Sequence, residues 1–161
     1  MSGFQLAQIN VGRLLAPVED PQIADFVANL DRINALAEDQ PGFIWRLTGA
    51  GGDATDIRPV EDDPLMAINM SVWTDLDALA AFVYRTAHRD VMRRRREWFE
   101  AMEVYMTLWW VSTGHTPTPA EGMGRLALLK RIGPTADAFT FRNPFPAPDR
   151  AAITPVLDEC A

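Results

Sequence analysis

The chain has 161 residues, a formal net charge of −7 at pH 7 and 48% hydrophobic residues. This composition is typical of one soluble globular domain, and the acidic balance argues against a dedicated nucleic-acid binder, which needs a net basic surface. The single cysteine, Cys160, excludes an internal disulfide framework and a cysteine-rich metal site. We see neither a secretory signal nor a membrane span, so we expect a cytoplasmic protein without membrane contact.

The first part of the chain predicts a strand, a helix and a second strand. Residues 4–14 alternate between apolar and polar side chains, which is the period of a half-buried strand. Asp20 followed by Pro21 is a typical helix start, and apolar residues at helical spacing follow it over 23–36. Aromatic and β-branched residues over 43–48 then indicate a strand.

The next part of the chain predicts a long loop, a third strand, a second helix and a fourth strand. Segment 49–64 is rich in glycine, proline and acidic residues and indicates a long exposed loop. Residues 65–73 predict a third strand, residues 76–102 one long helix and residues 107–115 a fourth strand. The resulting order is β-α-β-β-α-β.

That order predicts an α+β fold of the ferredoxin-like kind, with a four-stranded antiparallel sheet covered by helices on one face. We divide the chain into a ferredoxin-like domain over 1–115 and a C-terminal extension over 116–161. The extension comprises a short helix over 119–132 and a proline-rich tail that we expect to run along the surface. The other face of the sheet is left bare, so we expect a second copy of the chain to cover it in a homodimer.

Five segments together resemble the bacterial family DUF3291: LAQINVGRL, FVANLDRINALAEDQPGFIWRL, SVWTDLDALAAFVYRTAHRDVMRRRREWF, LWWVSTGHTPTPAEGMGRL and GPTADAFTFRNPFPAP. The resemblance implies an uncharacterised branch of the dimeric α/β-barrel superfamily, whose members include antibiotic-biosynthesis monooxygenases of the YdhR kind. The resemblance implies a homodimer in which two ferredoxin-like sheets close an eight-stranded barrel. It implies no particular activity.

Six arginines crowd the segment VYRTAHRDVMRRRREWF over 83–99. An ordinary solvated helix face, with acidic partners such as Asp90 and Glu97, is one interpretation. An anion or carboxylate site made by one or two of these arginines is a second. Nucleic-acid binding is a third, which the lack of further basic segments disfavours.

His88 lies within the same segment. On a continuous helix, Tyr84, His88, Val91, Arg95 and Trp98 would share one face, which places His88 between core and solvent. A hydrogen-bonded structural histidine is one interpretation. A general base or acid, or an axial ligand of haem iron, is the other. The second histidine of the chain, at the end of the fourth strand, is typical of a loop edge.

Polar residues also occupy the interiors of the predicted strands: Gln8, Asn10, Arg46, Asn69 and Ser71. Such groups must be paired or solvated, because an unsatisfied buried amide or hydroxyl costs roughly 1–3 kcal/mol. They either line a small-molecule cavity beneath the helices or form a structural network within the dimer barrel.

Our functional hypothesis combines these residues with the superfamily resemblance. It is a small-molecule enzyme with a cofactor-independent, monooxygenase-like reaction on an aromatic or polycyclic metabolite. The catalytic candidates are His88 as base, with Asn69 and Arg46 stabilising the oxyanion. The substrate-binding candidates are Asn10, Trp45, Ser71, Tyr84, Trp98 and Trp110. Zinc, dinucleotide, P-loop and nucleophile-elbow motifs are absent from the sequence. The alternative is a non-catalytic protein that binds haem or another small ligand.

Overall fold

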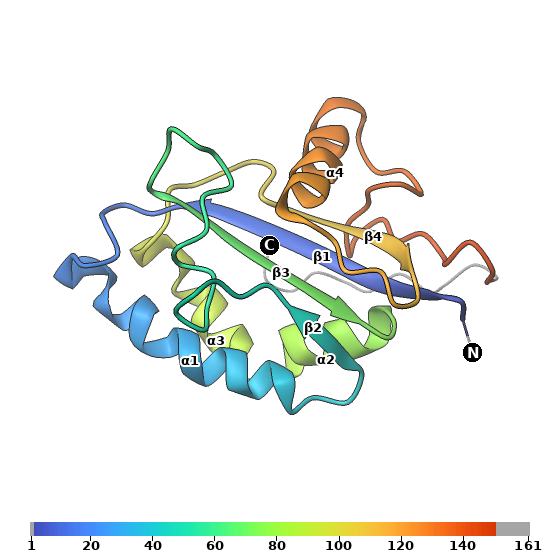
Figure 1. Cartoon of the computed structure of the whole chain (residues 1–161), viewed down its shortest axis with the longest axis horizontal. Coiled ribbons are helices and arrows are strands. Elements are labelled where there is room, and N and C mark those ends of the chain that lie inside the picture. Colours follow the sequence, from blue (N-terminus) through green and yellow to red (C-terminus); the bar gives the residue numbers. More distant parts are fainter. Residues whose placement is uncertain (1, 151–161) are drawn as a thin grey trace.

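The computed structural model describes residues 2–150, and Cys160 lies outside this part. Four strands form one antiparallel sheet in the order β2-β3-β1-β4 (Figure 1). They are β1 (Phe4–Arg13), β2 (Phe43–Arg46), β3 (Met66–Trp73) and β4 (Met106–Ser112). With the helices between them, these strands have the connectivity of a ferredoxin-like sandwich, so the predicted α+β fold is confirmed.

Helices cover both faces of the sheet. They are α1 (Ala24–Glu38), α2 (Leu76–Arg85), α3 (His88–Arg93) and α4 (Pro119–Ile132), with single 3₁₀ turns at Pro21–Ile23 and Arg95–Glu97. The first three lie on one side of the sheet and α4 lies on the other (Figure 1). The predicted start at Asp20 is confirmed, because its carboxylate accepts a hydrogen bond from the Gln22 backbone N–H at 2.8 Å.

The register of the two central strands places their polar residues side by side. Gln8 of β1 pairs with Ser71 of β3, and Asn10 pairs with Asn69. Because side chains alternate along a strand, these four residues lie on one side of the sheet, and they line the same cavity as residues of α1. The intervening apolar residues, such as Ile9, lie on the opposite face.

The long helix predicted over 76–102 is wrong. Thr86 has an extended backbone, with φ −118° and ψ −178°, and it separates α2 from α3. Its hydroxyl donates to the Phe82 carbonyl oxygen at 2.5 Å and accepts from the His88 backbone N–H at 3.2 Å. Threonine side chains compete for backbone groups in this way and favour helix ends. Tyr84 and His88 therefore belong to different helices.

The expectation of a bare second sheet face is also wrong. Helix α4 packs on β1 and β4, and Ile9, Met70 and Trp109 are completely buried within one chain. A Cβ at Gly122 of α4 would lie 2.8 Å from the Ile9 Cδ1, which shows how closely this helix approaches the sheet. The apolar face thus needs no second copy to cover it. The homodimer stays a prediction.

The tail after α4 does not simply follow the surface. Phe139 is completely buried, and its backbone N–H and C=O both bond to the backbone of Leu108 in β4, at 2.9 and 2.8 Å. Phe141 is 5% exposed and contacts the Tyr84 ring. The aromatic side chains bury too much apolar area to remain in water, and this overrides the extended tendency of the neighbouring prolines. The division into domains at residue 115 stays a prediction.

Over residues 2–150, none of the helices combines the length and the apolar character that crossing a membrane requires.

Candidate active site

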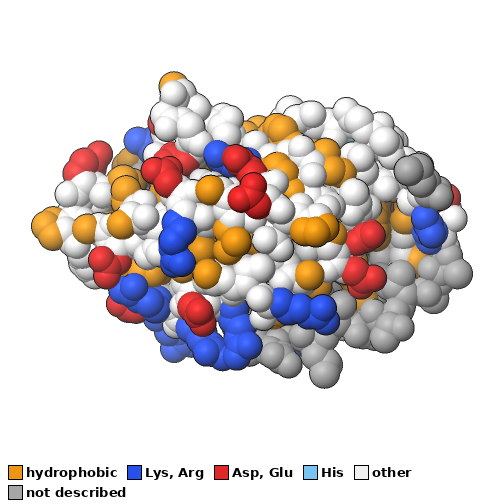
Figure 2. Space-filling model, turned by 90° about the horizontal axis from the view of Figure 1, so that it is seen from below, with side chains coloured by type: hydrophobic (Ala, Val, Ile, Leu, Met, Phe, Trp, Pro, Cys, Tyr) orange, Lys and Arg blue, Asp and Glu red, His pale blue; other side chains and the backbone are white. Residues whose placement is uncertain are grey.

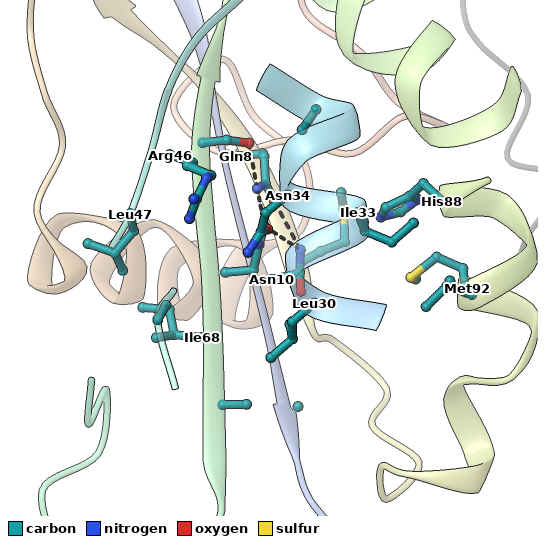
Figure 3. A pocket seen from close by; sticks show the side chains of 18 of the residues that line it. Gln8, Asn10, Leu30, Ile33, Asn34, Arg46, Leu47, Ile68, His88 and Met92 are labelled. Atoms are coloured by element: carbon teal, nitrogen blue, oxygen red, sulfur yellow. Dashed lines mark hydrogen bonds between the residues drawn. The ribbon is translucent and has the colours of Figure 1, made fainter. Parts of the chain in front are cut away.

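A cavity of about 210 Å³ lies between the sheet and the helices α1 to α3. Figure 3 shows Leu30 and Ile33 of α1, and Met92 of α3, on the helical side. The polar residues of β1 and β3 line the opposite side. Six of the predicted site residues therefore share a single cavity with His88: Asn10, Arg46, Asn69, Ser71, Tyr84 and Trp98.

The sheet contributes a hydrogen-bonded amide network to this cavity (Figure 3). The Gln8 amide donates to the Asn69 Oδ1 at 2.6 Å and to the Ser71 Oγ at 2.8 Å. The Asn10 amide donates to the Gln8 Oε1 at 3.2 Å and to the Asn69 Oδ1 at 3.3 Å. The Trp73 indole N–H donates to the Ser71 Oγ at 2.8 Å. The network fixes the orientation of each amide.

The same network leaves specific groups available to a ligand. The Asn69 Oδ1 accepts two hydrogen bonds, whereas its Nδ2 has no acceptor within residues 2–150. Asn69 is also exposed although it lies on the cavity side of the sheet. Its amide is therefore a fixed donor that a ligand oxygen can use.

His88 lies on the helical side of the cavity (Figure 3). Its ring lies 4.8 Å from the Phe82 ring, between centroids, and its Nδ1 is buried with no hydrogen-bond partner in the described part of the chain. Burial lowers the pKa of His88 to about 4, and a hydrogen bond to the Val83 backbone opposes this shift to a smaller extent. The imidazole is therefore neutral at pH 7 and can accept a hydrogen bond or a proton.

Arg46 lines the cavity from β2 (Figure 3). Its Nε contacts the Glu38 Oε1 at 2.6 Å, and its Nη1 donates to the Gly52 carbonyl oxygen at 3.0 Å. The carboxylate partly neutralises this guanidinium. Arg46 is consequently a weaker candidate for stabilising an oxyanion than the sequence indicates.

The predicted aromatic residues divide into two groups. Tyr84 and Trp98 line the cavity. Trp98 is 2% exposed and packs against Phe26 of α1, with 5.7 Å between ring centroids. Trp45 packs instead against the cluster on the opposite sheet face, and the Trp110 indole donates to the Phe145 carbonyl oxygen at 2.9 Å. Neither of these two lines the cavity.

Sequence reasoning missed the part that α1 plays in this site. Leu30, Ile33 and Asn34 line the cavity, whereas the apolar residues of this helix indicate only core packing. One signal was available in the sequence, because Asn34 is a polar residue between apolar neighbours. Arg95 also lines the cavity, and its Nη2 donates to the Val11 carbonyl oxygen at 3.1 Å.

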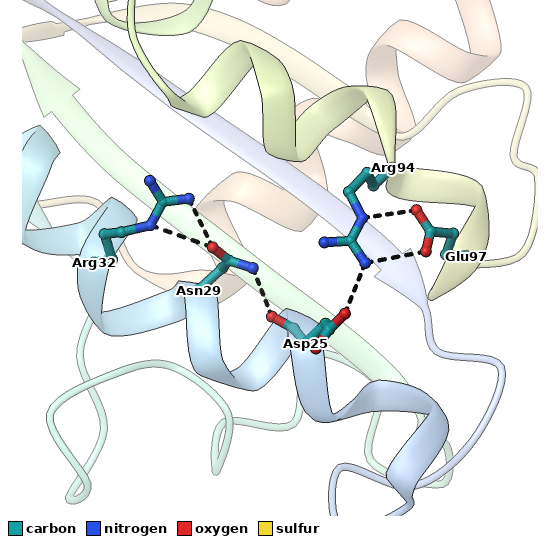
Figure 4. A network of polar contacts seen from close by, with 5 residues as sticks. All are labelled: Asp25, Asn29, Arg32, Arg94 and Glu97. Carbon is teal, nitrogen blue, oxygen red and sulfur yellow. Dashed lines mark hydrogen bonds and ion pairs between the residues drawn. The ribbon is translucent and has the colours of Figure 1, made fainter.

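A polar network joins α1 to the segment after α3 (Figure 4). Arg94 contacts Asp25 at 2.8 Å and Glu97 at 2.8 Å. On α1, the Asn29 amide donates to the Asp25 backbone carbonyl, and Arg32 donates to Asn29. These contacts link α1 to the segment after α3 at the border of the cavity. They also show that Arg94, one of the six arginines over 83–99, is a paired surface residue.

The chain belongs to the family described as domain of unknown function DUF3291, whose model matches residues 5–155. The membership that the sequence predicts is therefore confirmed. A comparison with curated proteins gives no match.

Two solved structures are similar to this chain. SnoaB, a cofactor-independent oxygenase from Streptomyces nogalater, is 18% identical; the match covers 70% of this chain and 95% of SnoaB, with a TM-score of 0.46. NE2512, a protein of unknown function from Nitrosomonas europaea, is 14% identical; the match covers 73% of this chain and 96% of NE2512, with a TM-score of 0.45. At these identities neither structure defines a reaction for this chain.

Proposed function

We propose that this protein binds a small hydroxylated aromatic molecule in the cavity between the sheet and α1 to α3, and promotes its reaction with dioxygen. The observation that carries the proposal is that His88 lines this cavity and that its Nδ1 is buried without a hydrogen-bond partner within residues 2–150. A buried polar atom without a partner costs free energy, and a ligand hydroxyl would satisfy it.

The size and composition of the cavity support a ligand of one or two rings. An engineered apolar cavity of about 150 Å³ holds benzene, and this cavity has about 210 Å³. Apolar side chains on α1 and α3 face amide groups on the sheet. Such a site suits a flat molecule with an apolar body and a polar edge.

The fixed polar groups indicate how such a ligand would be activated. His88 accepts the proton of the hydroxyl or of an activated CH₂ group, and Asn69 Nδ2 donates to the oxygen that becomes negative. The resulting anion stabilises the protonated imidazole and raises the pKa of His88 in the complex. The low pKa of His88 in the free protein thus keeps the imidazole neutral before the ligand binds, so that it can accept the proton.

The oxidation needs no external reductant. An activated CH₂ group plus dioxygen gives a carbonyl plus water. One oxygen atom enters the product, the other leaves as water with both hydrogens, and the carbon supplies all four electrons. His88 only transfers the first proton and returns it to the departing oxygen. This reaction therefore requires only a base, a hydrogen-bond donor and a shaped cavity from the protein.

Non-catalytic binding is the second candidate, and the pKa of about 4 for His88 favours it. A base this weak forms a hydrogen bond with a phenol more readily than it removes the proton. Haem is a poor fit to the same site. The His88 Nδ1 has no partner in the described part of the chain, but it is buried. Pockets for drug-sized ligands already occupy roughly 300–1,000 Å³, and a porphyrin exceeds a volume of about 210 Å³.

Two measurements test the proposal. Anaerobic titration with β-naphthol, followed by tryptophan fluorescence, should show binding that weakens about tenfold in His88→Phe. His115→Gln, at the second and exposed histidine, should bind as the wild type does. Oxindole, a two-ring compound with an activated CH₂ group, should then be oxidised to isatin faster with wild type than with His88→Phe, with one dioxygen consumed per product. Binding without oxindole oxidation would contradict the oxygenase part and leave the binding protein, whereas unchanged β-naphthol affinity in His88→Phe would contradict the site.

A further inference from the structure

The charged side chains that line the cavity all have the same sign. Among the described residues that line it there is no aspartate or glutamate, although the chain contains 22 acidic residues. The lining instead includes three arginines, Arg46, Arg58 and Arg95. The charged side chains that line this cavity are thus all basic in an acidic protein, which favours a ligand that carries negative charge.

The three arginines differ in what neutralises them. Arg46 contacts Glu38 at 2.6 Å. Arg58 is exposed, and its Nη1 reaches the Pro64 carbonyl oxygen at 3.5 Å. Arg95 is partly buried and has no carboxylate partner within residues 2–150. Arg58 has no carboxylate partner within these residues either, but solvent screens its exposed charge, so Arg95 is the unpaired cavity arginine whose charge is screened least.

The surroundings of Arg95 hold its guanidinium in place without neutralising it. Its Nη2 donates to the Val11 carbonyl oxygen at 3.1 Å. The guanidinium carbon lies 4.1 Å from the centre of the Tyr105 ring and 5.1 Å from that of Phe99. Burial lowers the pKa of Arg95, and Tyr105 opposes this shift. The Val11 carbonyl occupies one of five N–H donors, so others stay available to a ligand.

Neighbouring arginines show that this arrangement is specific to one position. Arg94 is paired with Asp25 and Glu97 (Figure 4). Arg93 and Arg96 are exposed and do not line the cavity. Figure 2, which views the helical layer from outside, shows lysine and arginine side chains gathered along one edge of this surface. The exposed members of the run thus have an ordinary solvated role, and Arg95 does not.

We propose that the ligand is an aromatic carboxylate whose carboxyl group is bound by Arg95. This inference rests on the proposed function, because it assumes that the same cavity takes the ligand. An arginine guanidinium recognises a carboxylate through paired, charge-assisted hydrogen bonds. Tyr105 and Phe99 place apolar surface beside that group.

Arg95 and His88 lie in successive short elements that both border the cavity. His88 begins α3, and Arg95 begins the 3₁₀ turn that follows this helix, so the two residues are separate points on the wall of one cavity. A fused two-ring aromatic with a carboxylate at one end and a hydroxyl at the other would bridge these two points. The carboxylate would then bind to Arg95 while the hydroxyl reaches His88.

The test compares β-naphthoic acid with β-naphthol, which differ in the group that Arg95 would recognise. Calorimetric titration of the wild-type chain should show the acid binding more tightly than the alcohol. Arg95→Gln should weaken the acid at least about tenfold and leave the alcohol within about twofold, because only the acid loses charge-assisted hydrogen bonds. Arg95→Lys should recover part of the loss, since it keeps the charge. Arg96→Gln, a matched exposed arginine, should change neither ligand.

The outcomes separate this inference from the proposed function. Equal weakening of acid and alcohol in Arg95→Gln, with far-UV circular dichroism unchanged, would overturn the carboxylate role and make Arg95 a packing residue. A wild-type chain that binds the alcohol in a His88-dependent way but does not prefer the acid would overturn this inference alone. Binding of neither compound would overturn both.

Discussion

His88 is a neutral histidine in the folded chain, and this has a consequence for stability. Its pKa is about 4 when folded against 6.5 for an ordinary histidine. Above pH 6.5 both states are neutral, and its contribution is fully present. Between pH 6.5 and about 4 the unfolded chain binds the additional proton, so stability falls with falling pH, by up to about 3 kcal/mol.

Urea unfolding of wild type and His88→Gln between pH 7 and pH 4 measures this effect. The carboxylates titrate in both proteins, so the difference between the two curves reports on His88. We expect the wild type to lose more stability across this window than His88→Gln. Parallel curves for wild type and His88→Gln would show that His88 is not desolvated.

At the scale of elements, the break between α2 and α3 positions the site. The Thr86 hydroxyl bonds to Phe82 on one side and to His88 on the other. Thr86→Ala should lower the free energy of unfolding by about 1 kcal/mol, as expected for loss of a capping side chain. It should also weaken β-naphthol binding, since His88 begins α3.

Thr86→Ser provides the control for this prediction, because it keeps the hydroxyl. It should retain both stability and affinity. An alanine variant with unchanged affinity would show that the break does not place the His88 ring.

Much of the fold follows from the sequence alone, because strand alternation and helix capping are local. Asp20 and the helix at 119–132 illustrate this. The break at Thr86 is also local, but a hydroxyl within an apolar and basic helical pattern gives only a weak signal. The sequence offers a place for Asn69 in a cavity as one of two alternatives. It gives no indication that Arg46 pairs with Glu38. That contact joins residues of a helix and a strand whose spacing depends on how the whole sheet packs.

At the scale of the whole molecule, the close contact of α4 with the sheet replaces the expected cover by a second chain. Gly122→Ala should reduce stability by roughly 1 kcal/mol or more, because the added Cβ lies 2.8 Å from the Ile9 Cδ1. Gly124→Ala, in the same helix, meets no atom within 4 Å and should instead stabilise by roughly 0.5–1 kcal/mol through its better helix propensity.

Thermal unfolding of the two variants distinguishes these effects. A stabilising Gly122→Ala would mean that α4 is not docked on β1 and β4 as described. Native mass spectrometry of the same samples tests whether the chain forms the predicted homodimer. Because α4 covers one face of the sheet, such a dimer would use another surface.

The central claim is that the cavity beneath α1 and α3 is the ligand site. A crystal structure of the protein with a bromo-β-naphthol tests this claim most directly, because the anomalous signal of bromine locates the ligand. We predict one bromine peak in the cavity between Ile33, Met92 and the sheet, with the ligand hydroxyl within hydrogen-bond distance of the His88 Nδ1. Bromine bound elsewhere on the molecule, with the cavity free of ligand, would contradict the account.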